Sequence, residues 1–115
     1  MNSEERDRAV LEKMIQYCGE AAECVSRCGG TMEGFMNDKI CRYAGAMCLM
    51  QIGELTKPLS DAAKRHMSAI EWRAVYGLRN IVAHAYATLD WNMIWSTIAT
   101  DLPTLKHACE EYLNS

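Results

Sequence analysis

Apolar residues recur every three to four positions along most of the chain, the spacing that places them on one face of an α-helix. Asn2 and Ser3 are favourable N-cap residues, and Gly29 with Gly30 is typical of a helix end. Between them lies a broad apolar stripe made of Val10, Leu11, Met14, Ile15, Cys18, Ala21, Ala22 and Val25. The pattern predicts a long first amphipathic helix that begins after Asn2 or Ser3 and ends at the two glycines.

Residues 31–35, T-M-E-G-F, are expected to form a connector whose Phe35 fills part of the core. Asn37 and Asp38 then favour the start of a second helix, which should run as far as residues 57–58. Its positions at helical spacing are Ile40, Ala44, Met47, Cys48, Gln51, Ile52 and Leu55. Because these positions cover a wide arc, this helix is expected at the centre of the fold.

Two further helix starts follow the second helix. Ser60 is placed to cap a short helix that extends to Met67. Ser68 and Glu71 then have the spacing of a capping box, which predicts the start of a third main helix with Trp72 as its buried anchor.

The last segment is expected to start at Thr88 or Asp90 and to meet Pro103, which should kink or restart it. Its inward positions are Trp91, Ile94, Trp95, Ile98, Leu105, Ala108, Cys109, Tyr112 and Leu113. No strand pattern, repeat or glycine-rich phosphate loop is present. We therefore predict one domain, residues 1–115, that is all-α: an antiparallel up-and-down bundle of four main helices plus a short one.

The net charge of −3 gives no overall basic field, so nucleic-acid binding would have to rest on a local patch. The candidate basic residues are Lys57, Lys64, Arg65, Arg73 and Arg79. Eight methionines and three tryptophans exceed what a core of this size usually holds. Some of the apolar surface is therefore expected to face a second copy of the chain.

The six cysteines include no C-x2-C pair and accompany no paired histidine spacing, so neither a zinc site nor a cofactor is expected. Buried thiols are the ordinary interpretation of cysteines at apolar helical positions. The charged N-terminus lacks the apolar stretch of a signal peptide, and no apolar run reaches the roughly 18 residues that a membrane span requires. We expect a reduced, soluble, cytoplasmic protein.

Residues 72–86, W-R-A-V-Y-G-L-R-N-I-V-A-H-A-Y, concentrate the candidate chemistry in Arg79, Asn80, His84 and Tyr86. Wound as one helix, this stretch places Arg73, Gly77, Asn80 and His84 on one face, and Val75, Leu78, Val82 and Ala85 on the opposite face. Asn80 and His84 are one turn apart, so the amide is expected to hydrogen-bond the imidazole and fix its tautomer. The helix should end after His84, with Tyr86 just beyond it.

The same winding places Arg79 in the apolar arc, where an unpaired guanidinium is costly. Glu54 lies near the end of the second helix, where the helix dipole disfavours an acid. Pairing the two would hold the guanidinium and leave part of it for a phosphate. A solvated Glu54 on an exposed last turn is the alternative, and the sequence does not choose between them.

A histidine held by an amide, near an arginine that can bind phosphate, is the minimum set for RNA transphosphorylation. His84 would take a proton from a ribose 2′-OH or give one to the leaving 5′-oxygen. Arg79 would stabilise charge on the non-bridging oxygens, and no metal is required. A lone histidine near a helix end is more often a surface or capping residue, so spacing alone does not establish catalysis.

The motif R-N-I-V-A-H-A-Y resembles the R-x4-H-x-Y motif of the HepT-like branch of the HEPN superfamily. The flanking I-E-W-R-A-V-Y-G-L-R-N, the earlier Q-I-G-E-L, and the later W-N-M-I-W and D-L-P-T-L also resemble that branch, so the similarity runs from about Phe35 to the end. Ala85 is a departure, because many members carry an acidic residue there.

The resemblance implies a HEPN-like helical fold and a metal-independent endoribonuclease toxin that cleaves single-stranded RNA. It implies a homodimer with two motifs facing each other across a cleft, and neutralisation by an MNT nucleotidyltransferase antitoxin that AMPylates Tyr86. Arg79, His84 and Asn80 would be the catalytic residues, with Glu54 and Arg73 in support. The alternative function is a non-catalytic helical partner or substrate-binding subunit of a nucleotidyltransferase.

Overall fold

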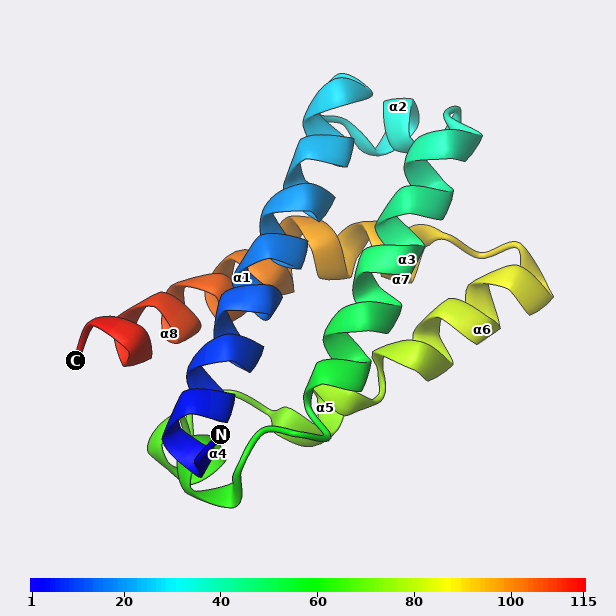
Figure 1. Cartoon of the computed structure of the whole chain (residues 1–115). Helices are drawn as coiled ribbons and strands as arrows, with labels where there is room; N and C mark the ends of the chain where they lie inside the picture. The colour runs from blue at the N-terminus through cyan, green and yellow to red at the C-terminus, as the bar shows by residue number, and fades with distance from the viewer.

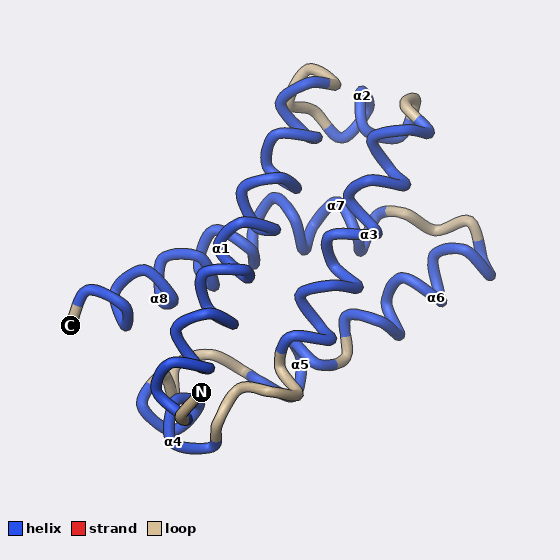
Figure 2. Tube along the Cα trace, in the orientation of Figure 1, coloured by secondary structure: helices blue, strands red, loops and turns tan.

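The computed structural model describes all 115 residues and contains helices and no strands, which confirms the all-α class. Figure 1 and Figure 2 show the helices joined by short loops. The elements are α1 (Ser3–Arg27), α2 (Met32–Met36), α3 (Lys39–Leu55), α4 (Asp61–His66), α5 (Trp72–Tyr76), α6 (Leu78–Thr88), α7 (Asn92–Ser96), the π-helical turn η1 (Thr97–Asp101) and α8 (Leu102–Asn114). None of the helices is both long enough and apolar enough to cross a bilayer.

Helices α1 and α3 lie side by side and run in opposite directions at the centre of the fold (Figure 1). Asn2 caps α1 by accepting the N–H of Glu5 at 2.8 Å, and Asp38 caps α3 in the same way at 3.0 Å. Gly29 and Gly30 follow α1 with φ angles of 97° and 72°, a region that glycine adopts without strain. The predicted starts of both helices and the predicted end of α1 are confirmed.

The buried face of α3 differs from the predicted one. Ile40 and Met47 are 80% and 55% exposed, whereas Gly45 and Ala46 are buried. A Cβ atom at Gly45 would lie 2.8 Å from the Cδ1 atom of Ile98, so a side chain here would require the end of Ile98 to shift. The inward placement of Ile40 and Met47 is wrong because close helix packing favours small residues over large apolar ones at these contacts.

The segment expected to be a connector forms the short helix α2. The Thr31 hydroxyl oxygen accepts the N–H of Gly34 at 3.0 Å and so caps this helix. Phe35 is fully buried, as predicted, and its ring centroid lies 5.7 Å from that of Trp95. A Cβ atom at Gly34 would fall 1.9 Å from the carbonyl oxygen of Cys28, so the tight turn before α2 requires glycine.

The predicted third helix is divided at Gly77 into α5 and α6. Glu71 occupies the N-cap position of α5 and no side chain caps this helix, so the predicted capping box at Ser68 is wrong. Trp72 is half-buried and not fully buried, and its indole N–H donates to the carbonyl of Met67 at 3.2 Å.

Helix α6 extends to Thr88, one turn beyond the predicted end after His84. The Thr88 hydroxyl donates to the carbonyl of His84 at 2.9 Å and so satisfies one acceptor of the last turn. Leu89 then ends the helix in the left-handed region with a φ of 60°. Asp90 accepts the N–H of Asn92 at 3.2 Å just before α7, close to the predicted start of the last segment.

The C-terminal segment is one continuous rod, α7–η1–α8, that crosses behind α1 and α3 (Figure 1). Pro103 lies in the first turn of α8, where its missing N–H needs no partner, and the helix widens into η1 just before it. The sequence predicted a kink or a restart at Pro103, and α8 begins at Leu102, directly before this proline, without a break in the chain of helical turns. Buried residues of the rod include Trp91, Ile94, Ile98, Leu105 and Cys109.

The buried carboxylate of Asp7 ties the start of α1 to the start of α4. One of its oxygens accepts the N–H of Ser60 at 2.9 Å, and the other accepts the Ser60 hydroxyl at 2.6 Å. The Ser60 oxygen in turn accepts the N–H of Ala63 at 3.1 Å, which confirms the predicted cap of this short helix. Asp7 is only 5% exposed, so both of its oxygens depend on these bonds.

Asp7→Ala is expected to lower the free energy of unfolding by about 1–3 kcal/mol, because it removes the buried acceptor of two bonds and leaves the partly buried donors of Ser60 without a partner. Urea denaturation followed by circular dichroism measures this loss. Glu12→Ala is the control, since Glu12 is exposed on the same helix and makes only a long 3.8 Å ion pair with Arg8. Equal stability of the two variants would contradict a structural role for Asp7.

Candidate active site

Helix α6 carries all four polar residues of the candidate site. Its buried face consists of Leu78, Val82 and Ala85, as the sequence predicted. The side chains of Arg79, Asn80, His84 and Tyr86 are exposed around the rest of the helix. The apolar face therefore fixes the helix to the fold and turns the polar residues toward solvent.

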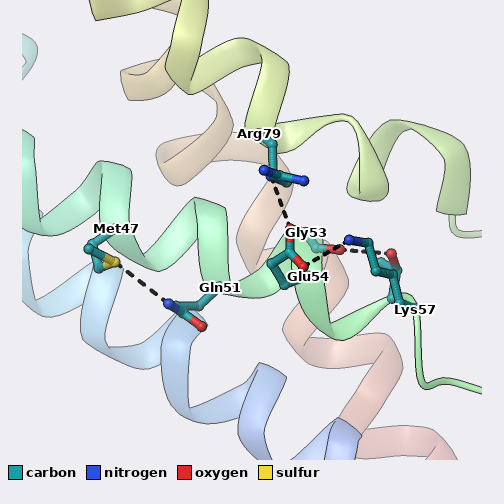
Figure 3. Close-up of polar contacts among 7 residues, drawn as sticks. Met47, Gln51, Gly53, Glu54, Lys57 and Arg79 are labelled. Atoms are coloured by element: carbon teal, nitrogen blue, oxygen red, sulfur yellow. Dashed lines mark hydrogen bonds and ion pairs between the residues drawn. The ribbon is translucent and has the colours of Figure 1, made fainter.

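Arg79 and Glu54 form the predicted pair across α6 and α3. The Nε atom of Arg79 lies 2.9 Å from Oε1 of Glu54, and the ammonium of Lys57 lies 3.0 Å from the other carboxylate oxygen (Figure 3). The hydrogen bond from Lys57 and the nearby positive charge of Arg79 hold the pKa of Glu54 below its usual range. The alternative of a Glu54 without a protein partner is excluded.

Arg79 is less buried than the sequence predicted. Its side chain is 49% exposed, because the residue lies at the edge of the apolar arc and reaches sideways to α3. Nε is the only nitrogen of this guanidinium that has a partner in the fold. Its two terminal nitrogens, with four N–H donors, are left for a ligand, and their planar arrangement suits a phosphate.

Gly53 allows the helix carrying the motif to approach α3. A Cβ atom at this position would lie 3.3 Å from the carbonyl oxygens of both Val75 and Tyr76, and 3.5 Å from Cγ of Arg79. The two contacts with carbonyl oxygens are tighter than ordinary packing, whereas the contact with Arg79 is not. The absence of a side chain at Gly53 therefore allows the backbone of α5 to lie close to α3, just before Arg79.

Asn80 and His84 are one turn apart on α6, but no hydrogen bond joins their side chains, so that prediction is wrong. Both side chains point to solvent, where water competes for the amide and the imidazole. Arg73 is also exposed, but it lies on α5, and the break at Gly77 removes it from the continuous face predicted for one helix. The imidazole of His84 and the amide of Asn80 have no protein partner.

Arg79 and His84 do not converge on one point within a single chain. Five positions of an α-helix turn by about 140° relative to each other. Arg79 faces α3 through its contact with Glu54, so His84 faces outward, away from α3. One copy of the chain therefore presents the two candidate catalytic groups on different sides of α6.

Tyr86 lies inside α6, not beyond its end as predicted. Its ring packs against Tyr43 of α3 at 5.7 Å between centroids, and edge-on against Trp91 at 4.8 Å. The side chain is still 48% exposed, and its hydroxyl has no hydrogen-bond partner. Desolvation, with a smaller contribution from Tyr43, raises the pKa of this phenol, which is therefore neutral at physiological pH.

Sequence reasoning missed Tyr43 as a neighbour of the site, and it named Lys57 as a candidate basic residue without its contact with Glu54. Tyr43 and Glu54 are eleven residues apart, which is close to three helical turns, so they share one side of α3. Met47 lies between them and accepts a bond from Gln51 on the same side (Figure 3). The apolar residues Tyr43 and Met47, followed on the same side of α3 by Glu54, were the signal in the sequence that could have indicated this surface.

No group of three or more metal-ligating side chains is assembled in the structure.

Comparison with known proteins identifies the family. Residues 14–112 match the family model described as "Ribonuclease HepT-like", which extends the similarity into the first helix, earlier than Phe35. A protein of Caldanaerobacter subterraneus subsp. tengcongensis, named as an inferred RNase, is 30% identical over 92% of this chain and 93% of its own length. "Probable ribonuclease HepT" of Thermococcus cleftensis is 34% identical over 69% of this chain and 72% of its own length.

A protein of Methanocaldococcus jannaschii, also named as an inferred RNase, is 32% identical over 66% of this chain and 70% of its own length. No solved structure matches the chain at a significant level. The chain belongs to the HepT-like ribonuclease family, and it is a ribonuclease. Family membership therefore favours an enzyme over a non-catalytic binding subunit.

Proposed function

We propose that this protein is a metal-independent endoribonuclease that cleaves single-stranded RNA and acts in the cytoplasm as the toxin of a HEPN/MNT toxin–antitoxin module. The observation that carries the proposal is that both candidate groups of α6 can be reached by a substrate, although they lie on different sides of the helix. His84 has an exposed imidazole without a protein partner, and Arg79 is held by Glu54 through Nε alone. Both groups are therefore available to a substrate phosphate.

In the proposed reaction the ribose 2′-oxygen attacks the adjacent phosphorus, and the bond from phosphorus to the 5′-oxygen breaks. His84 takes the proton of the 2′-OH or gives one to the departing oxygen. The terminal N–H groups of Arg79 stabilise the charge on the non-bridging oxygens. The products are a 2′,3′-cyclic phosphate and a 5′-OH end.

Asn80 and Arg73 have supporting places in this proposal. Asn80 is exposed one turn before His84, where its amide can hydrogen-bond the bound RNA or orient the imidazole. Arg73 is exposed on α5 and adds a positive charge beside the start of α6. Glu54 and Lys57 act indirectly, since they fix the guanidinium of Arg79.

A homodimer completes the proposed active site. Arg79 and His84 diverge on one helix, so Arg79 of one subunit and His84 of its partner would act on the same phosphate across a composite cleft. Exposed large apolar residues on α3, at the end of α6 and on α7 support association with a second copy. These residues are Ile40, Met47, Leu89 and Met93.

Neutralisation is proposed to occur at Tyr86 through a cognate nucleotidyltransferase. The phenol oxygen would form a bond to the α-phosphorus of ATP, pyrophosphate would leave, and a base of the partner enzyme would take the proton. The hydroxyl is exposed and has no partner, which supports access. The attached AMP adds negative charge and bulk beside the site, where it would repel an RNA phosphate.

His84→Ala is expected to lower kcat for RNA cleavage by about 10²-fold or more while leaving the fold intact, because the removed side chain is an exposed proton-transfer group. Cleavage of a labelled single-stranded RNA in EDTA measures this, and the product ends are assayed for 2′,3′-cyclic phosphate. His107→Ala, which removes an exposed histidine paired with Glu111 on α8, is the matched control. Wild-type rates in His84→Ala, or strict dependence on Mg²⁺, would contradict the mechanism.

Arg79→Lys is expected to reduce cleavage nearly as much as Arg79→Ala does. Lysine keeps the charge but lacks the planar group that contacts Glu54 and a phosphate at once. Arg27→Lys is the control, because Arg27 also pairs with a glutamate, Glu23, at 2.9 Å. Retention of most activity in Arg79→Lys would show that charge alone suffices.

Tyr86→Phe is expected to remain largely active but to escape neutralisation by the nucleotidyltransferase and ATP, because only the acceptor oxygen is removed. Mass spectrometry of the wild-type protein co-expressed with that enzyme should show added multiples of AMP on the Tyr86 peptide. An unmodified peptide, together with equal suppression of wild type and Tyr86→Phe, would assign inhibition to complex formation.

A further inference from the structure

Two tyrosines from different helices form an exposed aromatic surface beside the candidate active site. Tyr43 of α3 and Tyr86 of α6 have ring centroids 5.7 Å apart with their planes tilted by 36°. Their side chains are 46% and 48% exposed, respectively, whereas Trp91 behind them is only 7% exposed. The Trp91 ring lies 4.8 Å from that of Tyr86 and 6.2 Å from that of Tyr43.

A cation lies beside these rings. The guanidinium of Arg42 lies 5.5 Å from the centre of the Trp91 ring and donates to the carbonyl of Met36. Arg42 is half-buried, so its positive charge supports an attraction for phosphate, while the exposed tyrosine rings are the groups on which a base of single-stranded nucleic acid can stack. An aliphatic surface would not offer both contacts.

The aromatic surface and Arg79 lie on the same side of α6. Arg79 contacts Glu54 of α3, and Tyr86 contacts Tyr43 of the same helix. Seven residues separate Arg79 from Tyr86, which is about two turns and about 10 Å along the helix axis. A phosphate at Arg79 and a base at Tyr86 can therefore belong to neighbouring nucleotides of one strand.

The outer side of α6 is open between the tyrosines and the histidine. Ala83 and Ala87 are exposed on that arc, and each presents only a methyl group. A strand can thus pass from the aromatic surface over the helix to His84 without displacing a large side chain. This path connects the stacked base to the proposed proton-transfer group.

We propose that Tyr43 and Tyr86 form a stacking site for a nucleobase of the RNA substrate, next to the phosphate held by Arg79. This inference rests on the proposed cleavage of single-stranded RNA and adds Tyr43 as a substrate-binding residue. Stacking on a ring tolerates every base, so the site contributes affinity and places the strand without selecting a sequence. The alternative is that a second copy of the chain covers this surface, and the experiment below distinguishes that contact from RNA stacking.

The primary test is binding of a fluorescein-labelled single-stranded RNA of mixed sequence, measured by anisotropy on the full chain in the His84→Ala background to prevent cleavage. Tyr43→Leu is expected to raise Kd by about 5-fold to 150-fold, the range of ~1–3 kcal/mol measured for base stacking on aromatic side chains. Tyr43→Phe keeps the ring, so its Kd for the RNA should stay close to that of the chain with Tyr43. In chains with His84 intact, Tyr43→Leu should raise KM more than it lowers kcat.

A second measurement separates stacking from a structural effect. A single abasic site is moved along the RNA, and one position should weaken binding to the chain with Tyr43 but not to Tyr43→Leu. Tyr112→Leu is the matched control, since Tyr112 is half-buried and packs edge-on against His66 at 5.1 Å on the C-terminal helix. The Kd of Tyr112→Leu for the RNA should equal that of the His84→Ala chain in which it is made.

An unchanged Kd in Tyr43→Leu would overturn the stacking site. The stacking site would also be overturned if an abasic site weakened RNA binding equally in chains with and without the Tyr43 ring. Dissociation of the oligomer in light scattering, with no abasic position sensitive to Tyr43, would assign the surface to contact between copies of the chain. Failure of the wild type to cleave RNA would overturn the proposed ribonuclease mechanism, and the binding measurement would still decide the stacking site.

Discussion

The ion pair between Arg79 and Glu54 is the interaction on which the rest of the site depends. The end of α5 approaches α3 at Gly53, where a side chain would press against the backbone carbonyls of Val75 and Tyr76, and Arg79 follows on α6 within reach of Glu54. Lys57 engages the second carboxylate oxygen and keeps the acid charged. The guanidinium is thereby fixed through Nε, and its terminal nitrogens have no partner in the fold. A phosphate would meet a donor pair that is already oriented.

The angular position of each residue on α6 divides the helix into three sides. Leu78, Val82 and Ala85 are buried, Arg79 and Tyr86 meet α3, and His84 points outward. This division explains why a single chain keeps its phosphate-binding and proton-transfer groups apart. An active site that needs both is most simply completed by a second copy, which agrees with the exposed apolar surface of α3 and α7.

Tyr86 connects the two proposals. Its ring belongs to the aromatic surface with Tyr43 and Trp91, and its hydroxyl is the proposed acceptor of AMP. A modification at that oxygen would place charge and bulk over the rings on which a base is proposed to stack. Regulation and substrate binding would then compete for one surface, and inhibition would need no change of fold.

The sequence by itself determined the helical class, the cap at Ser60 and the polar residues of α6, because these follow from local spacing and side-chain chemistry. It placed the starts of α1 and α3 to within one residue, and the structure selected Asn2 and Asp38 as the caps. It also placed Glu54 as a partner for Arg79, although it left a solvated glutamate equally open. Only the tertiary structure decided that pairing. It also decided which face of α3 is buried, the break at Gly77, the position of Tyr86 inside α6 and its contact with Tyr43. These features depend on how closely helices distant in sequence approach one another, and periodicity within one helix carries no information on that distance.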